Sequence, residues 1–473
     1  MLTLGHLLEA LTGQQVPGAG QVITDAAIDS RLVIPGALFI ALPGERTDGH
    51  DYVQAAFERG ASFALVEREM PADLHQLDLR GPLGKDEPLS LEFPLCLRVE
   101  NSLVALQRIA KHWRNQLQVR VIGVTGSVGK STTKELAAEV LEVRYRTLKN
   151  PGNLNNEIGL PISLLRLTES HERAVLEMGF YVPGEIALLC SLARPQVGVI
   201  TNVSQVHMER AGSLEAIVAG KTELVASLPP APEGVAVLNY DEPLVRSMAD
   251  HTQAVVFSYG LSPEANLWAS DVQSLGLEGI RFVLHYQGDE IHVRVPLLGQ
   301  HSAHTALRAA AIGLIEGLTW EEIVGGLQGS QSQLRLVAVQ GPGGSLLLDD
   351  TYNAAPPSVT AALNLLAELE GRHVAVLGDM LELGDYEERG HRMVGARAAE
   401  VADLLVTVGQ RAHWIADEAL QAGLPQSSVF LFPDSQAATE HLRSTIGAGD
   451  VVLVKGSRGM HMDEIVTALE EDA

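Results

Sequence analysis

The sequence predicts an α/β protein of three domains, on the basis of its length and of how its apolar segments alternate. Its 473 residues exceed the roughly 250 to 300 at which a single hydrophobic core stops growing. Short strand-like apolar runs alternate with segments of helical period, which is typical of mostly parallel sheets covered by helices. We expect a smaller α/β domain over residues 1–115, a central domain over 116–331 and a third domain over 332–473.

The first domain is expected to end in a loop. The segment HQLDLRGPLGKDEPLSLEF, over residues 75–93, is rich in glycine, proline and charge between more apolar stretches. This composition favours irregular structure.

The two later domains show the alternation most clearly. In the central domain, parallel strands are predicted at VRVIGVTG, AVLEMG, VGVITNV and GVAVLNY, and helices at KSTTKELAAEVLEV and SLEAIVAGKTELVASL. From about Ala254 to Pro296 residues alternate in character, as in IRFVLHYQGDEIHVRV, which predicts an antiparallel hairpin flanking the parallel sheet. After Gln331 the runs SLLLDD, HVAVLGDM, DLLVTVG, SVFLF and VVLVKGS predict a doubly wound, Rossmann-like domain.

Charge and composition narrow the classes of function. A formal net charge of -25 would repel a phosphate backbone, which argues against a nucleic-acid binder. The N-terminus MLTLGHLLEALTG has no basic region and the apolar runs are short, so we expect neither export nor membrane insertion but a cytoplasmic protein. Cys96 and Cys190 are the two cysteines, and we expect them to pack as small apolar residues rather than form a disulfide or a zinc site.

A phosphate-binding loop is predicted where the strand VRVIGV runs into TGSVGKSTTKE. The helix that follows would direct free backbone N–H groups at phosphate, and Gly126 and Gly129 would let the chain approach it. Lys130 would reach the β and γ phosphates of ATP, and Ser131 would hold Mg²⁺. Val124 replaces the first glycine of the general pattern, so only the form G-x-x-G-K-S is met. Nucleotide contacts are expected from Thr125, Gly126, Ser127, Val128, Gly129, Lys130, Ser131 and Thr132.

Three further polar residues are predicted to converge near this loop. Glu177 ends the strand AVLE, His207 follows the strand VGVITNVS, and Lys221 lies on the next helix. Open α/β sheets bind ligands at the carboxyl ends of their strands. Each residue alone could equally be an ordinary surface residue. The chain has only seven lysines against 27 arginines, which suggests a chemical reason where lysine was kept.

Taken in order, the motifs resemble the muramyl-peptide ligases, or Mur ligase family. The phosphate loop is similar to the family's TGSxGKT followed by TKE, and KNPGNLNNEIGLP, EMG and GEI come after it. In the third domain, DDTYNAAPPS, LGDMLELG and VLVKGSRGM resemble signatures of the members that add D-alanyl-D-alanine. Near the N-terminus, ITDAAIDSR and PGALFIALPGERTDGHDYVQAAFERGA resemble the domain that receives a UDP-muramyl peptide.

The resemblance implies an ATP-dependent amide ligase of peptidoglycan precursor synthesis that joins D-alanyl-D-alanine to a UDP-N-acetylmuramoyl-tripeptide through an acyl-phosphate. It implies catalytic roles for Lys130, Glu177, His207 and Lys221. Two Mg²⁺ ions are expected near Ser131, Glu177, His207 and a carbamylated Lys221. Further ATP contacts are expected at Asn239, Asp241, Arg335 and Asp350. Substrate contacts are expected at Ser30, Arg31, Thr47, Asp48, Gly49, Tyr352, Asn353, Lys455 and Ser457. We expect a monomer whose partners are these small molecules.

The chain departs from the family pattern at several positions. The family usually has asparagine at the positions of Tyr181, Thr305 and Ala355. It usually has PGR at those of Gln333, Leu334 and Arg335, of which only Arg335 is kept. These changes bear on adenine contacts, peptide contacts and the hinge to the third domain. Two alternatives stay open. One is a related ligase that adds a single amino acid to a UDP-muramyl peptide, or that acts on folate or a storage polymer. The other is a P-loop ATPase without ligase activity.

Overall fold

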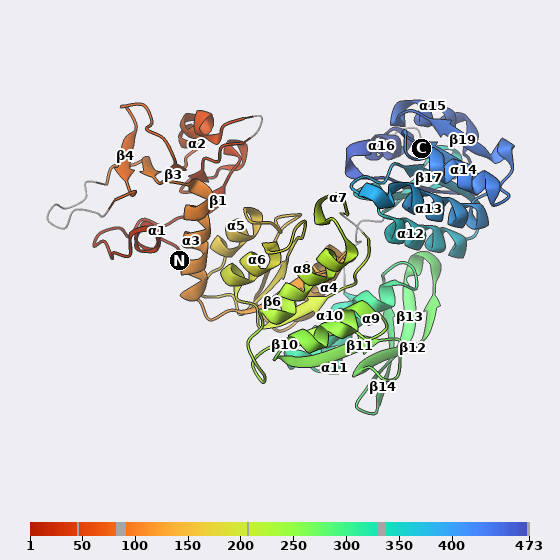
Figure 1. Ribbon diagram of the computed structural model, residues 1–473, viewed down its shortest axis with the longest axis horizontal. Helices are drawn as coiled ribbons and strands as arrows, with labels where there is room; N and C mark the ends of the chain where they lie inside the picture. The colour runs from red at the N-terminus through yellow and green to blue at the C-terminus, as the bar shows by residue number, and fades with distance from the viewer. Residues whose placement is uncertain (45–46, 82–90, 206–207, 330–336, 471–473) are drawn as a thin grey trace.

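The computed structural model describes residues 1–44, 47–81, 91–205, 208–329 and 337–470. Within these ranges the chain forms three α/β units, each with its own sheet, which follow one another across the molecule (Figure 1). The predicted three-domain α/β class is confirmed. His207, Gln333, Leu334 and Arg335, which the sequence singled out, lie outside the described residues.

The N-terminal sheet is parallel throughout its described part. Its strands, in spatial order, are β1 (Ala26–Ala27), β2 (Leu38–Ile40), β3 (Phe63–Val66), β5 (Leu95–Arg98) and β4 (His75–Asp78). The expected loop over residues 75–93 is therefore wrong for its first four residues. Strand β4 lies at the sheet edge with three of its four side chains exposed, so it lacks the apolar pattern that identifies buried strands.

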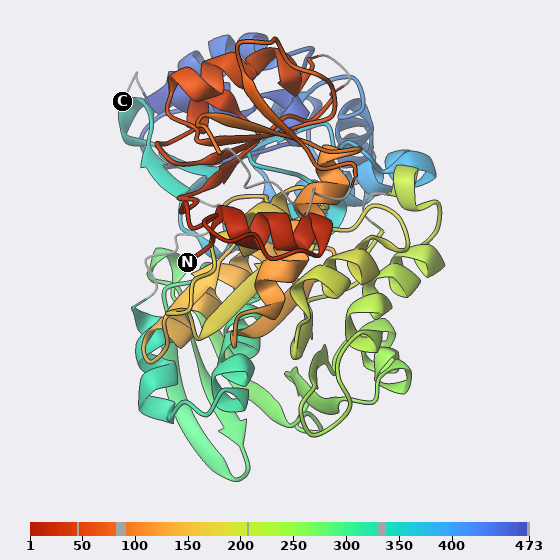
Figure 2. The ribbon, with the colours of Figure 1, turned by 90° about the vertical axis from the view of Figure 1, so that its left-hand side faces the viewer.

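Helix α3 (Ser102–Asn115) connects the first unit to the central one. It packs against α1 (Leu4–Thr12) and against α5 (Gly159–Leu165) of the central unit. Its Trp113 is buried, and the indole Nε1 donates to Leu167 O at 2.9 Å. One continuous apolar core runs from the first sheet through α3 into the central unit, and Figure 2 shows α1 lying across this junction. The small helix α2 (Val53–Glu58) belongs to the first unit.

The central sheet is mostly parallel with an antiparallel flank. Its described strands, in spatial order, are β14 (Asp289–Val295), β13 (Ile280–Tyr286), β12 (Leu267–Ser274), β11 (Val255–Gly260), β10 (Val235–Asn239), β9 (Val197–Ile200), β6 (Arg120–Thr125), β8 (Arg173–Glu177) and β7 (Thr147–Lys149). The β13–β14 hairpin confirms the predicted flank. The change in pairing begins later than expected, because β11 runs parallel to β10 and β12 parallel to β11. Only the β12–β13–β14 part is antiparallel.

Helices cover both faces of the central sheet. Helices α4 (Lys130–Glu142), α10 (Ser302–Ile315) and α11 (Trp320–Gln328) share one apolar core with the sheet. On the other face lie α5, α6 (Glu185–Ala193) and α8 (Leu214–Ala226). The predicted helices α4 and α8 are confirmed, and the Ser213 side chain caps α8 by accepting from Ala216 N. The short helices α7 (Met208–Ala211) and α9 (Pro243–Arg246) lie in connections.

The C-terminal unit is doubly wound, as predicted. Its described strands, in spatial order, are β15 (Val337–Gln340), β16 (Leu346–Asp350), β20 (Asp450–Lys455), β17 (Arg372–Gly378), β18 (Leu404–Val408) and β19 (Val429–Phe432). One face packs against α12 (Pro356–Glu368), α13 (Glu387–Val401) and α14 (His413–Gln421), and the other against α15 (Ser435–Thr445) and α16 (Asp463–Glu470). The edge strand β15 is antiparallel and was not predicted.

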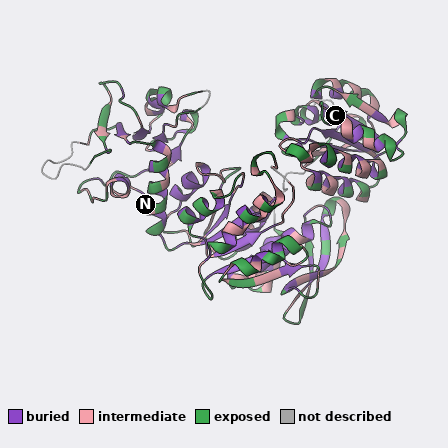
Figure 3. Cartoon of the chain, in the orientation of Figure 1, coloured by how far each residue is buried: buried purple, intermediate pink, exposed green. Residues whose placement is uncertain are grey.

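The central strands of all three units are buried, whereas edge strands such as β4 and β15 are not (Figure 3). Cys96 and Cys190 are both buried and free, which agrees with their predicted packing role. Burial raises the pKa of each thiol to about 12. No helix in the described ranges combines the length and apolarity needed to cross a bilayer.

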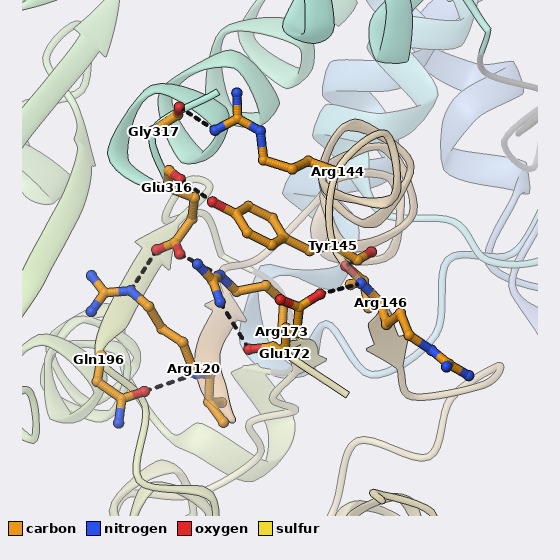
Figure 4. Close-up of polar contacts among 11 residues, drawn as sticks. Arg120, Arg144, Tyr145, Arg146, Glu172, Arg173, Gln196, Glu316 and Gly317 are labelled. Carbon is orange, nitrogen blue, oxygen red and sulfur yellow. Dashed lines mark hydrogen bonds and ion pairs between the residues drawn. The ribbon is translucent and has the colours of Figure 1, made fainter. Parts of the chain in front are cut away.

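An ionic network around the buried Glu316 closes the end of the central sheet where β6 and β8 begin (Figure 4). The Glu316 carboxylate, with 1% of its side chain exposed, accepts from Arg120 Nε at 2.6 Å and from Arg173 Nε at 2.5 Å. The Tyr145 hydroxyl donates to Glu316 O at 2.7 Å, and Arg173 stacks over its ring. Each charge in this network has an opposite partner.

Candidate active site

The predicted phosphate loop joins β6 to α4 at the other end of the central sheet. Gly126 has φ +148°, and a Cβ there would lie 1.8 Å from Thr201 Oγ1, so only glycine fits. Gly129 is left-handed at φ +81° and precedes the first helical residue, Lys130. Lys130 Nζ donates to Gly126 O at 2.9 Å and to Ser127 O at 3.1 Å. The loop therefore places an ammonium group at the N-terminus of α4, where free N–H groups favour an anion.

The segment after β9 holds this loop in shape. Val128 N donates to Asn202 Oδ1 at 2.8 Å, and Thr201 Oγ1 donates to Val128 O at 2.7 Å. Ser127 Oγ donates to Ser204 O at 3.1 Å. Because these bonds hold the loop from behind, the segment that follows β9 sets its curvature.

Glu177 lies beside the phosphate loop, as the sequence predicted. It ends β8 in register with Val124 and is only 3% exposed. Its Oε2 accepts from Ser131 Oγ at 2.6 Å, and its Oε1 accepts from Asn155 Nδ2 at 2.8 Å. A solvent-exposed strand end is excluded for Glu177. A carboxylate and a hydroxyl oxygen side by side are donors that suit Mg²⁺.

Lys221 is buried on α8 with 2% of its surface exposed. Its Nζ lies 5.0 Å from the centroid of the Phe180 ring, and in the described part of the chain it makes no hydrogen bond. Burial lowers the pKa of Lys221 well below its usual value, and the charge of Lys130 adds to this. The alternative of an ordinary surface cation is wrong.

A cavity of about 900 Å³ lies between the central and C-terminal units. The phosphate loop and Glu177 line one side, and Asp350, Tyr352 and Asn353 line the other. Parallel strands of both sheets end here, which is the usual ligand position in open α/β sheets. The three departures from the family pattern that the structure describes, at Tyr181, Thr305 and Ala355, also line this cavity.

The C-terminal wall is organised around Lys455. Asp350 and Lys455 are paired residues at the ends of β16 and β20. Lys455 Nζ, buried with its side chain 2% exposed, donates to Asp350 Oδ2 at 2.7 Å and to Asn353 O at 2.9 Å. Ser457 Oγ accepts from Leu381 N at 2.9 Å. Asp350, Asn353 and Lys455 are thus bonded together, and Ser457 and Tyr352 line the same cavity.

Asn239 and Asp241 lie further from the loop. Asn239 ends β10, and its Oδ1 accepts from Asp241 N at 3.0 Å. Asp241 accepts from Leu261 N at 2.7 Å and is bonded to His304 Nε2 at 2.8 Å. Neither residue lines the described cavity wall.

The predicted first-domain residues are not brought to the cavity. Arg31 is paired with Asp29, its Nη2 2.7 Å from Asp29 Oδ2, and Ser30 is buried beside it. Asp48 binds the His50 ring at 2.6 Å. Thr47, which is exposed, and Gly49, which is half-buried, flank Asp48, and a Cβ on Gly49 would meet Leu42 N at 2.7 Å. In Figure 1 this unit lies across the central unit from the C-terminal one.

Comparison with known proteins identifies the family. Three family descriptions match: Mur ligase family, catalytic domain, over residues 22–76; Mur ligase middle domain over 124–313; and Mur ligase, glutamate ligase domain, over 334–458. The chain is 37% identical to the UDP-N-acetylmuramoyl-tripeptide–D-alanyl-D-alanine ligase of Bacillus subtilis (strain 168), over 95% of the chain and 94% of that protein. The chain belongs to the Mur ligase family.

Solved structures of the Mur ligase family share this architecture. A crystal structure of MurF from Acinetobacter baumannii has a TM-score of 0.84 at 30% identity, and the match covers 100% of the chain and 99% of that structure. The MurF ligase from Thermotoga maritima in complex with ADP has a TM-score of 0.77 at 26% identity, and the match covers 95% and 97%.

Some residues that shape this Mur ligase site were not predicted from the sequence. Asn155 fixes Glu177, and Asn202 fixes the phosphate loop. Asn155 belongs to the KNPGNLNNEIGLP motif, so the motif was a usable signal. His301 also lines the cavity. Burial lowers its pKa to about 4, and the charges of His304 and Arg308 contribute.

Proposed function

We propose that this Mur ligase is an ATP-dependent enzyme that adds D-alanyl-D-alanine to a UDP-N-acetylmuramoyl-tripeptide in peptidoglycan synthesis. The observation that carries this is similarity over nearly the full chain to a relative named for that reaction. The motifs DDTYNAAPPS, LGDMLELG and VLVKGSRGM support it, because their residues line the same cavity as the phosphate loop.

The reaction proceeds in two transfers. A carboxylate oxygen of the tripeptide attacks the γ phosphorus of ATP, and the bond from this phosphorus to the β–γ bridging oxygen breaks. ADP is released, and the tripeptide now carries an acyl-phosphate. The amine of D-alanyl-D-alanine then attacks the acyl carbon, loses a proton and expels inorganic phosphate, which leaves an amide. Lys130 and the N-terminus of α4 stabilise the charge on the transferred phosphoryl group.

Two Mg²⁺ ions would neutralise phosphate charge during the first transfer. Ser131 and Glu177 fit this role, since their oxygens lie 2.6 Å apart beside the loop. In the described ranges, no three His, Cys, Asp or Glu side chains gather as a metal site. The ligand set therefore needs other donors, which we assign to His207 and to a carbamate on Lys221.

The burial of Lys221 supports the carbamate. Only a neutral amine attacks carbon dioxide, and burial lowers the pKa of Lys221 toward that form. The nitrogen forms a bond to the carbon of CO₂ and releases one proton, which leaves an anion with two oxygens. Such oxygens are hard ligands for Mg²⁺, and the resulting charge would compensate the ammonium of nearby Lys130.

The three domains divide the substrates. We assign the first domain, residues 1–115, to the UDP-linked substrate through Ser30, Arg31, Thr47, Asp48 and Gly49. The central domain, 116–331, binds ATP through the phosphate loop, Asn239 and Asp241. The third domain, 332–473, completes the site, with Asp350 and Arg335 toward the nucleotide and Tyr352, Asn353, Lys455 and Ser457 toward substrate. The first domain must move toward the cavity, so that water is excluded from the acyl-phosphate.

The decisive experiment measures phosphate release from purified protein with ATP and Mg²⁺. Release should require both a UDP-muramyl-tripeptide and D-alanyl-D-alanine. Preference for a free amino acid and a UDP-muramyl-dipeptide would identify a single-residue-adding ligase instead. Release without either substrate would identify an ATPase. Analytical ultracentrifugation of the same sample tests our expectation of a monomer. The use of ATP as a substrate is consistent with the cytoplasmic location that we propose.

A further inference from the structure

Arg308, in the middle of α10, is buried with 4% of its surface exposed. Its guanidinium makes three hydrogen bonds, all to neutral hydroxyl groups. Nε donates to Thr133 Oγ1 at 2.8 Å, Nη1 to Tyr259 OH at 3.2 Å, and Nη2 to Thr305 Oγ1 at 2.8 Å. As far as the described residues go, no carboxylate lies within ion-pair distance. Glu242 interacts with Arg308 only at longer range, and a buried cation without a directly paired counter-charge is costly.

The guanidinium lies directly behind the phosphate loop. Thr133, which accepts from Arg308, itself donates to Gly129 O at 2.7 Å. A Cβ placed on Gly129 would be 3.3 Å from Arg308 Nη2. Thr305 lines the cavity. Arg308 therefore touches the first turn of α4 and one wall residue of the cavity at once.

Arg114 shows what a buried structural arginine looks like in this chain. It is also 4% exposed, but its nitrogens donate to the carbonyls of Leu117, Val119 and Ala193 at 2.7 to 3.0 Å. Ala193 is the last residue of α6, so the negative end of that helix compensates the charge. Arg308 lies instead by the positive end of α4, which adds to its charge. The two buried arginines thus have opposite electrostatic surroundings.

We propose that Arg308 is a positioning residue for the nucleotide whose missing counter-charge is the phosphate chain of ATP. It supplies a fixed positive charge behind the loop, while its three hydrogen bonds hold Thr133 and Thr305 in place. Only the backbone of Gly129 separates this charge from the phosphate position, and the low dielectric of the interior screens their attraction weakly. The inference rests on the proposed function, since it takes the cavity to be the ATP site.

Calorimetric binding of ATP, ADP and adenosine, each with Mg²⁺, tests this on the full chain. Arg308→Gln should weaken the binding of ATP at least about tenfold. It should weaken the binding of ADP by less, and that of adenosine by less than about twofold. Arg308→Lys keeps the charge and should keep the ratio of ATP to adenosine affinity within about threefold of the unmodified protein. Arg114→Gln, the matched control, should leave this ratio unchanged.

Equal losses of affinity for ATP and for adenosine in Arg308→Gln would overturn the proposal, because a structural defect would weaken the binding of both ligands whether or not they carry phosphates. A ratio lost in Arg114→Gln as well would also overturn it. If Arg308→Gln does not fold, Arg308→Lys decides, and a collapsed ratio there contradicts a role for charge. Failure of the unmodified protein to bind ATP would refute the proposed function instead.

Discussion

Glu316 and Lys221 are buried charged residues of the same central domain with opposite surroundings. The Glu316 carboxylate bonds to two arginines at the end of the sheet far from the cavity. Lys221 has the ring of Phe180 for a neighbour and no hydrogen bond in the described part of the chain. Both groups lose hydration on burial, but only for Glu316 do hydrogen-bonded partners offset the free energy of that loss.

This difference suggests a structural role for Glu316 and a chemical role for Lys221. A satisfied buried charge contributes to a unique, stable fold, and its removal should be felt mainly in stability. An uncompensated one is kept against stability, and such groups concentrate at functional sites. The following predictions test whether the two residues divide in this way, from the largest effect to the smallest.

Lys221→Arg should lose ligase activity by at least about a hundredfold, the scale of losing one preorganised charge-stabilising group. Arginine forms no stable carbamate and would bring a permanent cation to the metal site. Initial rates of phosphate release measure the loss, and circular dichroism checks the fold. An arginine variant with near-normal rates would return Lys221 to a packing role.

Lys221→Ala should also be inactive, but for the lack of an anion rather than the presence of a cation. Added acetate or formate can occupy the vacated space and meet the metal, so it should restore part of the rate. The arginine variant is the control and should not respond. Equal responses of the two variants would show a general salt effect.

Lys130→Ala should abolish turnover with little change in the melting temperature, because the Lys130 ammonium serves the phosphates, and its bonds to Gly126 O and Ser127 O stay within the phosphate loop. Activity within about tenfold of normal, or ~1.4 kcal/mol of barrier, would exclude the phosphate role.

Glu316→Gln should lower the free energy of unfolding by about 2 to 3 kcal/mol. Breaking a buried pair typically costs 3 to 5 kcal/mol, but Arg120 and Arg173 are partly exposed and regain some hydration. Urea unfolding measures this, and the rate per folded molecule should not change. Glu400→Gln, which removes an exposed pair with Arg397, should cost less than about 0.5 kcal/mol.

His301→Gln should flatten the pH dependence of stability. The folded-state pKa of His301 is about 4 because of burial, below its usual 6.5. The unfolded chain therefore binds the proton first, and stability is lost as pH falls from 6.5 toward 4. Between pH 7 and pH 5.5 the unmodified protein should lose about 1 kcal/mol more than the variant. An equal loss in both would show that His301 is not held neutral.

The sequence predicted the buried strands and much of the site because both carry local patterns. Strands β6, β8, β9 and β10 are apolar runs, and the phosphate loop is a contiguous motif. Strand β4 escaped prediction because its exposed side chains at a sheet edge lack that pattern. The short strand β7 was not predicted for the same reason, because it is no more than half-buried along its length.

The burial of the key cations depends on contacts between distant segments. Lys221 is buried because Phe180, after another strand, packs against Gly220, where a Cβ would lie 1.9 Å from its ring. Arg308 sits in a helix, and only the packing of α4 and β11 around it shows that its charge faces inward. A single sequence gives the residue type in both cases but not its surroundings.

The most direct test of the account is ¹³C NMR of the protein equilibrated with ¹³C-bicarbonate. The unmodified enzyme should show a protein-bound carbamate resonance that is absent from Lys221→Arg and that decreases in parallel with activity when carbon dioxide is removed. A fully active enzyme with no such resonance would contradict the claim that Lys221 is buried without a partner in order to become an anion.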